Sequence, residues 1–186
     1  MSLSPEVWAG DVVVLVGDPA VDSRTSAVAK AVGFGLATGS TTPQVVEIAD
    51  LGSGLLAAGD DHVRAARDAV SGARVLVVAT PVLKAGYAGV LKVFLDGLDP
   101  TALESTIAVP VVLAESSADG AKAEVQLRIV LEATGALLPV PSFVLEEHHL
   151  DHLPQYIHAW QQRFGLPVSA TVDALRFEEA SVLGAG

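Results

Sequence analysis

The residues best suited to bind a charged ligand lie together in one short segment. Ser23, Arg24, Thr25 and Ser26 follow one another at the predicted start of a helix. The first turn of a helix presents unpaired backbone N–H groups and the positive end of the helix dipole. Three hydroxyl groups and one guanidinium add further donors, so the segment suits a phosphate monoester. From this segment alone, a plain helix N-cap at Ser23 with an exposed Arg24 is an equally good interpretation.

A second candidate segment, residues 80–89, has the sequence Thr-Pro-Val-Leu-Lys-Ala-Gly-Tyr-Ala-Gly. Loops at the surface are usually polar, whereas this one is apolar and rich in small residues. Gly86 and Gly89 allow a flat ring to approach the backbone closely, Lys84 offers it a cation, and Tyr87 could stack on it. The alternative is that the apolar side chains cap the core or a subunit interface. A site shared between subunits would satisfy both interpretations.

Five apolar runs that predict buried strands alternate with helical patterns along the chain. The expected strands are residues 11–17, 44–48, 74–79, 107–114 and 142–145. Continuous apolar runs are typical of parallel strands covered on both faces, and right-handed crossover helices must join them. We therefore predict an α/β protein with a three-layer, flavodoxin-like doubly wound sheet of five parallel strands in the order 2-1-3-4-5.

The predicted topology also locates the functional loops. Helices are expected at residues 23–34, 60–71, 87–98, 121–136 and 153–164, and loops at residues 50–58, 80–86 and 116–120. In a sheet of this order, ligands bind beyond the carboxyl ends of the first, third and fourth strands. The function is therefore expected in loops 18–26, 80–87 and 115–121.

Length and composition exclude several classes of protein. The 186 residues suit a single domain, expected over residues 1–164, with residues 165–186 as a mobile tail or an arm on a partner subunit. A hydrophobic content of 51% with only 5% aromatics predicts an aliphatic core and excludes disorder as the main state. The net charge of −11 excludes a general nucleic-acid binder. The absence of cysteine excludes disulfides and a cysteine nucleophile.

Two further patterns concern location and metal binding. Residues 1–10 lack a basic stretch followed by an apolar one, and no apolar run reaches the roughly 18 residues of a membrane helix, so a cytoplasmic location is expected. Residues 146–152, Glu-Glu-His-His-Leu-Asp-His, contain metal-ligand types, with His148 and His152 four residues apart. Because this segment follows a strand, a solvated acidic turn is the favoured interpretation and no metal is expected. The turn could also border the ligand pocket of a neighbouring subunit.

The two candidate segments together resemble the NADPH-dependent FMN reductases. Ser23-Arg-Thr-Ser26 and Thr80-Pro-Val-Leu-Lys-Ala-Gly-Tyr-Ala-Gly-Val-Leu-Lys92 carry the resemblance, which runs from about Val12 to Leu145. More narrowly, the chain is similar to the branch that supplies reduced flavin to two-component monooxygenases such as those that desulfonate alkanesulfonates. The resemblance implies that the first loop holds the FMN phosphate, the second lines the isoalloxazine, and Asp18 and the third loop complete the pocket. The residues so implied are Asp18, Ser23, Arg24, Thr25, Ser26, Pro81, Val82, Leu83, Lys84, Tyr87, Ser116 and Ser117.

Three positions depart from the pattern of that family. Asp18 stands in place of serine after the first strand, Leu83 replaces an aromatic residue, and Ser116-Ser117 replaces a Gly-Gly pair. A carboxylate near a phosphate is unfavourable unless Asp18 turns away or caps a backbone N–H. Loss of a stacked aromatic weakens ring binding about tenfold at most. Together these departures predict weak flavin retention, which suits FMN that comes and goes as a substrate and equally suits a relative that has lost flavin reduction.

The resemblance implies transfer of a hydride from NADPH or NADH to flavin N5, followed by delivery of reduced FMN to a partner monooxygenase. Because the cofactor carries the chemistry, no catalytic acid or base is expected; Lys84 and nearby N–H groups would favour negative charge on the ring. Two alternatives stay open: an enzyme that keeps FMN bound and reduces quinones, azo dyes or chromate, and a non-catalytic subunit that regulates an oxygenase. A homodimer or homotetramer is also implied, and the apolar residues 82–95 support it.

Overall fold

A central sheet of parallel strands organises the chain. The computed structural model describes residues 12–37 and 42–183. The parallel strands are β1 (Val12–Val16), β2 (Gln44–Glu47), β3 (Val75–Leu83), β5 (Ile107–Ala114) and β6 (Phe143–Glu146). They lie in the order β2-β1-β3-β5-β6, and each neighbouring pair is parallel. Counted among the parallel strands alone, this is the predicted order 2-1-3-4-5, so the flavodoxin-like fold is confirmed.

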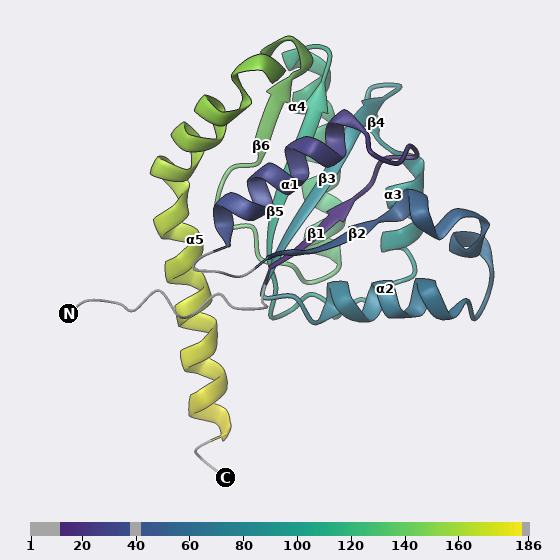
Figure 1. Cartoon of the computed structure of the whole chain (residues 1–186). Helices are drawn as coiled ribbons and strands as arrows, with labels where there is room; N and C mark the ends of the chain where they lie inside the picture. The colour runs from purple at the N-terminus through teal and green to yellow at the C-terminus, as the bar shows by residue number, and fades with distance from the viewer. Residues whose placement is uncertain (1–11, 38–41, 184–186) are drawn as a thin grey trace.

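Helices cover both faces of the sheet, which gives three layers (Figure 1). One face carries α1 (Arg24–Leu36) and α5 (Leu153–Leu183); the other carries α2 (Asp61–Ser71), α3 (Gly89–Leu95) and α4 (Ser117–Ala133). Side chains of β1 alternate between the two layers, with Val14 facing α1 and Leu15 facing the opposite helices, and both are fully buried. The predicted aliphatic core follows from this alternation, because every central strand must supply apolar groups to both faces.

Two of the predicted loops contain helical structure. Residues 50–58 fall largely in a 3-10 helix, η2 (Ile48–Leu56), and residues 117–120 form the first turn of α4. The second prediction failed because Gly120 was taken as a loop residue. A Cβ on Gly120 would lie 2.9 Å from Cγ1 of Val144, so this glycine allows α4 to pack closely on β6. Ser116, likewise, is the N-cap of α4.

The segment predicted as loop 80–86 is instead a β-hairpin. Strand β3 continues to Leu83 and pairs antiparallel with the short β4 (Gly86–Tyr87). The turn residues Lys84 and Ala85 have φ angles of 53° and 62°, the left-handed geometry of a two-residue type I′ turn. Because Tyr87 is used in β4, the next helix begins at Gly89 rather than at the predicted residue 87.

Buried Thr80 ties this hairpin to the start of α3. Its side chain is fully shielded from solvent, and its Oγ1 accepts a hydrogen bond of 2.9 Å from the backbone N–H of Ala88. The same hydroxyl donates to the carbonyl of Pro81 at 2.9 Å. Ala88 is the N-cap residue of α3, so one hydroxyl fixes both the strand exit and the helix entry.

Replacing Thr80 by valine is expected to lower the free energy of unfolding by about 1–3 kcal/mol. Valine keeps the shape of the side chain but leaves the buried N–H of Ala88 without an acceptor, and an unsatisfied buried donor costs about that much. Urea denaturation followed by circular dichroism measures the change. Thr80→Ser retains the hydroxyl and should remain closer to the wild type; equal stability of the valine variant and the wild type would contradict this role.

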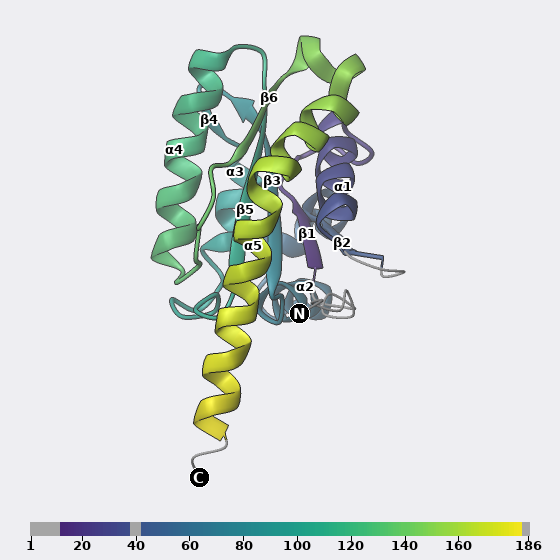
Figure 2. The same cartoon turned by 90° about the vertical axis from the view of Figure 1, so that its left-hand side faces the viewer.

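The last helix is longer than the sequence predicts. Instead of ending at residue 164, α5 passes Pro167 and continues to Leu183, so its C-terminal part extends beyond the sheet (Figure 2). The prediction ended the helix before Gly165, whereas Val168 and Val172 continue the apolar spacing beyond Pro167 and are buried. The expected domain end at residue 164 therefore falls inside a helix, and a role for the remainder as an arm on a partner subunit stays a prediction. Among the described helices, none has the length and hydropathy needed to cross a membrane.

Candidate functional site

A cavity of about 410 Å³ opens at the carboxyl ends of β1, β3 and β5. The ribbon in Figure 1 shows these strand ends at one edge of the sheet, near the start of α1. The three loops expected to carry function all contribute to its wall, as does one segment that was not expected. The lining residues are Asp18, Pro19, Ala20, Ser23, Arg24 and Thr25 from the first loop, Pro81, Val82 and Leu83 from the end of β3, Leu113 and Glu115 from the end of β5, and Glu147 after β6. The loops that follow β1, β3 and β5 therefore line the same cavity, at the edge where doubly wound sheets bind ligands.

The first loop forms the polar end of the cavity. Ser23 is the N-cap of α1, and its Oγ accepts a 3.1 Å hydrogen bond from the N–H of Ser26. The first backbone bond across this turn runs from the N–H of Ala27 to the carbonyl of Ser23. The N–H groups of Arg24 and Thr25 therefore precede the helical ladder and lie at the positive end of the helix dipole. With the hydroxyls of Ser23 and Thr25, they form a cradle that suits a phosphate group.

Ser26 does not line this cavity, although it belongs to the same segment. Its side chain is buried and its hydroxyl donates to the carboxylate of Glu47 at the end of β2. The amino group of Lys30 lies 2.8 Å from the same carboxylate, and this hydrogen bond raises the pKa of Lys30. The hydroxyl of Ser26 therefore anchors α1 to β2, and because its N–H donates to Ser23, Ser26 lies outside the cradle.

Asp18 lines the cavity, but one oxygen of its carboxylate already accepts a hydrogen bond from the backbone. It is 8% exposed, and its Oδ1 accepts a 2.9 Å hydrogen bond from the N–H of Ala20. Asp18 thus caps a backbone N–H, one of the two arrangements, with turning away, that lessen the repulsion between a carboxylate and a phosphate. The negative charge nevertheless remains in the wall of the cavity.

The end of β3 forms the apolar wall of the cavity. Pro81, Val82 and Leu83 face it together with Leu113 from the neighbouring β5, and Leu83 is 47% exposed. An apolar wall beside a polar cradle suits a planar ring that carries a charged tail.

Two other residues of the second segment lie elsewhere. Lys84 is exposed in the hairpin turn and does not line the cavity. Tyr87 packs against the core layer that contains α3, and burial raises the pKa of its hydroxyl. Their expected roles beside a flavin ring stay predictions, with Tyr87 placed as a packing residue.

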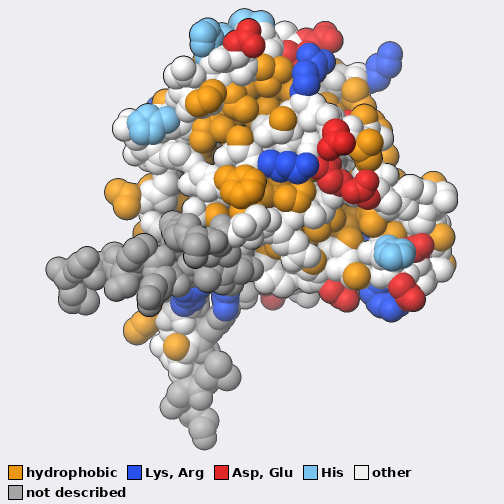
Figure 3. Space-filling model, in the orientation of Figure 1, with side chains coloured by type: hydrophobic (Ala, Val, Ile, Leu, Met, Phe, Trp, Pro, Cys, Tyr) orange, Lys and Arg blue, Asp and Glu red, His pale blue; other side chains and the backbone are white. Residues whose placement is uncertain are grey.

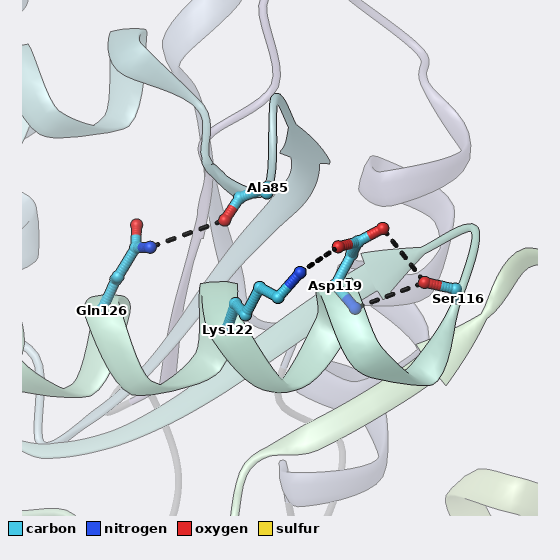
Figure 4. Close-up of polar contacts among 5 residues, drawn as sticks. All are labelled: Ala85, Ser116, Asp119, Lys122 and Gln126. Atoms are coloured by element: carbon cyan, nitrogen blue, oxygen red, sulfur yellow. Dashed lines mark hydrogen bonds and ion pairs between the residues drawn. The ribbon is translucent and has the colours of Figure 1, made fainter.

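The third loop contributes Glu115 to the cavity, whereas Ser116 and Ser117 lie outside the lining. The Oγ of Ser116 accepts from the N–H of Asp119 at 3.3 Å and donates to its carboxylate at 3.1 Å (Figure 4). Lys122 lies 2.9 Å from the same carboxylate, and hydrogen bonds from Lys122 and then Ser116 lower the pKa of Asp119. The two serines therefore begin α4, while the preceding residue faces the site.

Glu147 lines the cavity although it was not among the predicted ligand-binding residues. It lies in a 3-10 helix, η3 (Glu147–His152), and its Oε2 is 2.7 Å from Nη1 of Arg24. The segment was expected as an acidic turn that could border a neighbouring subunit's pocket, but it borders the cavity of its own chain. Nearby, His148 and His149 contact each other with ring centroids 3.9 Å apart. Across the part of the chain that the structure describes, no group of three potential ligands could hold a metal ion.

The donors and dimensions of the cavity fit the FMN that the sequence resemblance implies. Its volume lies within the roughly 300–1,000 Å³ that small-molecule sites occupy. The start of α1 offers N–H groups, hydroxyls and one guanidinium to a phosphate, and Pro81, Val82 and Leu83 offer an apolar face to a ring. Both ends of the ligand therefore have matching surfaces.

Comparisons with known proteins agree with this geometry. The family model described as NADPH-dependent FMN reductase matches residues 11–151. Among solved structures, the apo form of an NADH:FMN oxidoreductase (EMOB) is similar at 27% identity with a TM-score of 0.68, covering 90% of this chain and 88% of that one.

More distant structures share the fold. An oxidoreductase from Corynebacterium diphtheriae has 21% identity and a TM-score of 0.72, covering 88% of this chain and 97% of that one. A flavodoxin, WrbA-like protein from Agrobacterium tumefaciens has 15% identity and a TM-score of 0.60, covering 89% and 98%. No curated protein matches in the sequence search. Because the family model covers most of the sequence, the chain belongs to the NADPH-dependent FMN reductase family, as an oxidoreductase that uses FMN and NAD(P)H.

Proposed function

We propose that this chain reduces FMN as an exchangeable substrate and supplies the reduced flavin to a partner monooxygenase. The observation that carries the proposal is the single cavity that joins a phosphate cradle to an apolar wall. Three carboxylates, Asp18, Glu115 and Glu147, share this cavity with one cation, Arg24, and that balance disfavours permanent retention of a phosphorylated ligand. When bound, FMN supplies the redox chemistry by accepting a hydride from the nicotinamide at N5.

The residues of the chain bind and orient rather than exchange protons. The N–H groups of Arg24 and Thr25, with the hydroxyl of Ser23, hold the phosphate end at the start of α1. Pro81 and Val82 present the apolar wall, exclude water from one side of the ring and fix its plane. Hydride transfer to the flavin needs no acid or base from the protein.

Stopped-flow mixing of the purified chain with NADPH and FMN tests the proposal. We expect the nicotinamide absorbance to fall faster than in a control without enzyme, and the protein to be colourless after purification because FMN washes away. A yellow protein that transfers electrons to quinones or azo dyes would support the alternative of tightly bound FMN. No absorbance change, together with no FMN binding by calorimetry, would replace the proposal with a non-catalytic subunit.

We also propose assembly into a homodimer or homotetramer, but the residues that support it differ from those expected. Residues 82–95 were expected to supply the interface, but Leu91, Phe94 and Leu95 are buried in the chain's own core. Better support comes from Val125 and Ile129, which lie one turn apart on α4 and are 56% and 60% exposed. Figure 3 shows further hydrophobic side chains at the surface of the face that carries α1. A cytoplasmic location remains a proposal from the sequence, and the role of a monooxygenase as partner remains a proposal from the family resemblance.

A further inference from the structure

The ion pair between Arg24 and Glu147 lies across the part of the cavity assigned to the phosphate. Arg24 is the one cation among the described residues that line the cavity, and its Nη1 is 2.7 Å from Oε2 of Glu147. Glu147 is 28% exposed whereas Arg24 is 66% exposed, so the carboxylate is the better fixed partner. To bind the guanidinium of Arg24, a phosphate must therefore compete with the carboxylate of Glu147.

The three carboxylates of the cavity differ in what they contact. Asp18 caps the N–H of Ala20 at 2.9 Å, and Glu115 is exposed and makes no ion pair that involves another described residue of the cavity. Only Glu147 contacts Arg24. Its effect on a ligand is consequently local: it holds the guanidinium that a phosphate would otherwise bind.

We propose that Glu147 is a specificity-determining residue that holds down the affinity for phosphorylated flavin by occupying Arg24. The inference rests on the proposed function, since it concerns how FMN binds at the same site. Riboflavin has the same ring but no phosphate, so Glu147 discriminates against FMN relative to riboflavin. FMN then dissociates readily, as a flavin that is passed to another enzyme must.

A double-mutant cycle with two ligands tests this inference. FMN and riboflavin are titrated by flavin fluorescence against the wild type, Glu147→Gln, Arg24→Gln and the double variant, with thermal melts to show that each folds. Glu147→Gln is expected to tighten FMN binding about tenfold, the low end of what one charge-assisted hydrogen bond contributes, and to change riboflavin binding less than twofold. In the Arg24→Gln background the same substitution should change FMN affinity less than threefold, because its target is gone.

Glu115→Gln is the matched control, since it removes an equal charge from the same cavity without touching Arg24. It should raise FMN affinity less than threefold. The inference is overturned if Glu147→Gln leaves FMN affinity unchanged or lower, if riboflavin gains equally, or if the gain persists without Arg24. Failure of the wild type to bind either flavin would instead overturn the proposed function, and the inference with it.

Discussion

Replacing Arg24 by glutamine is expected to weaken FMN binding about ten- to hundredfold while changing riboflavin binding less than threefold. A hydrogen bond to a charged group contributes roughly 1.5–3 kcal/mol, and each 1.4 kcal/mol corresponds to a factor of ten in affinity. Arg24 is the cation of the cavity and stands at the first position of α1, where the phosphate cradle begins. Riboflavin lacks the phosphate, so loss of this guanidinium should have little effect on its binding.

Isothermal titration calorimetry with both flavins measures this effect. Arg64→Gln is a suitable control, because Arg64 is an exposed arginine on α2 that pairs with Asp61 and does not line the cavity. It should bind both flavins as the wild type does. An Arg24→Gln variant that holds FMN within twofold of the wild type would show that the phosphate lies elsewhere.

Replacing Leu83 by aspartate is expected to weaken FMN and riboflavin alike, by at least tenfold. Leu83 faces the cavity at the end of β3 and is 47% exposed, so the free protein should tolerate a charge there. A bound ring would cover that charge and strip it of water, and burying an unpaired polar or charged group costs at least 1–3 kcal/mol. Equal loss for both ligands would locate the ring, rather than the phosphate, at this wall.

Replacing Leu83 by an aromatic residue is expected to strengthen flavin binding instead. Leu83→Tyr adds an aromatic face beside the ring, and an aromatic pair contributes about 0.5–1.5 kcal/mol, so both flavins should bind up to about tenfold more tightly. Fluorescence titration of the two variants in parallel makes each the control for the other. If aspartate and tyrosine at position 83 have the same affinity as leucine, the ring does not contact Leu83.

The sheet and the site's location follow from the sequence because their signals are local. Each parallel strand is a continuous apolar run, and the run over residues 107–114 coincides with β5 (Ile107–Ala114). Once the strand order is known, the ligand edge follows from topology. The cradle at Ser23 is also local, since an N-cap residue acts on groups two or three positions away.

What the sequence misses depends on contacts between distant segments or on unusual turn residues. The hairpin after β3 turns through Lys84 and Ala85, which lack the Asn-Gly or Asp-Gly signal of type I′ turns. The ion pair between Glu147 and Arg24 joins the segment after β6 to the start of α1, and the local sequence of neither segment predicts contact with the other. Similarly, α5 continues past Pro167 because Val168 and Val172 are buried, a tertiary effect that outweighs local helix-stop signals.

A crystal structure of the protein grown with FMN tests the central claim most directly. We expect the phosphate within hydrogen-bonding distance of the N–H groups of Arg24 and Thr25, and the ring against Pro81, Val82 and Leu83. The Arg24 guanidinium should have left Glu147 for the phosphate. Flavin density on another surface of the chain, with this cavity closed by its own side chains, would contradict the account.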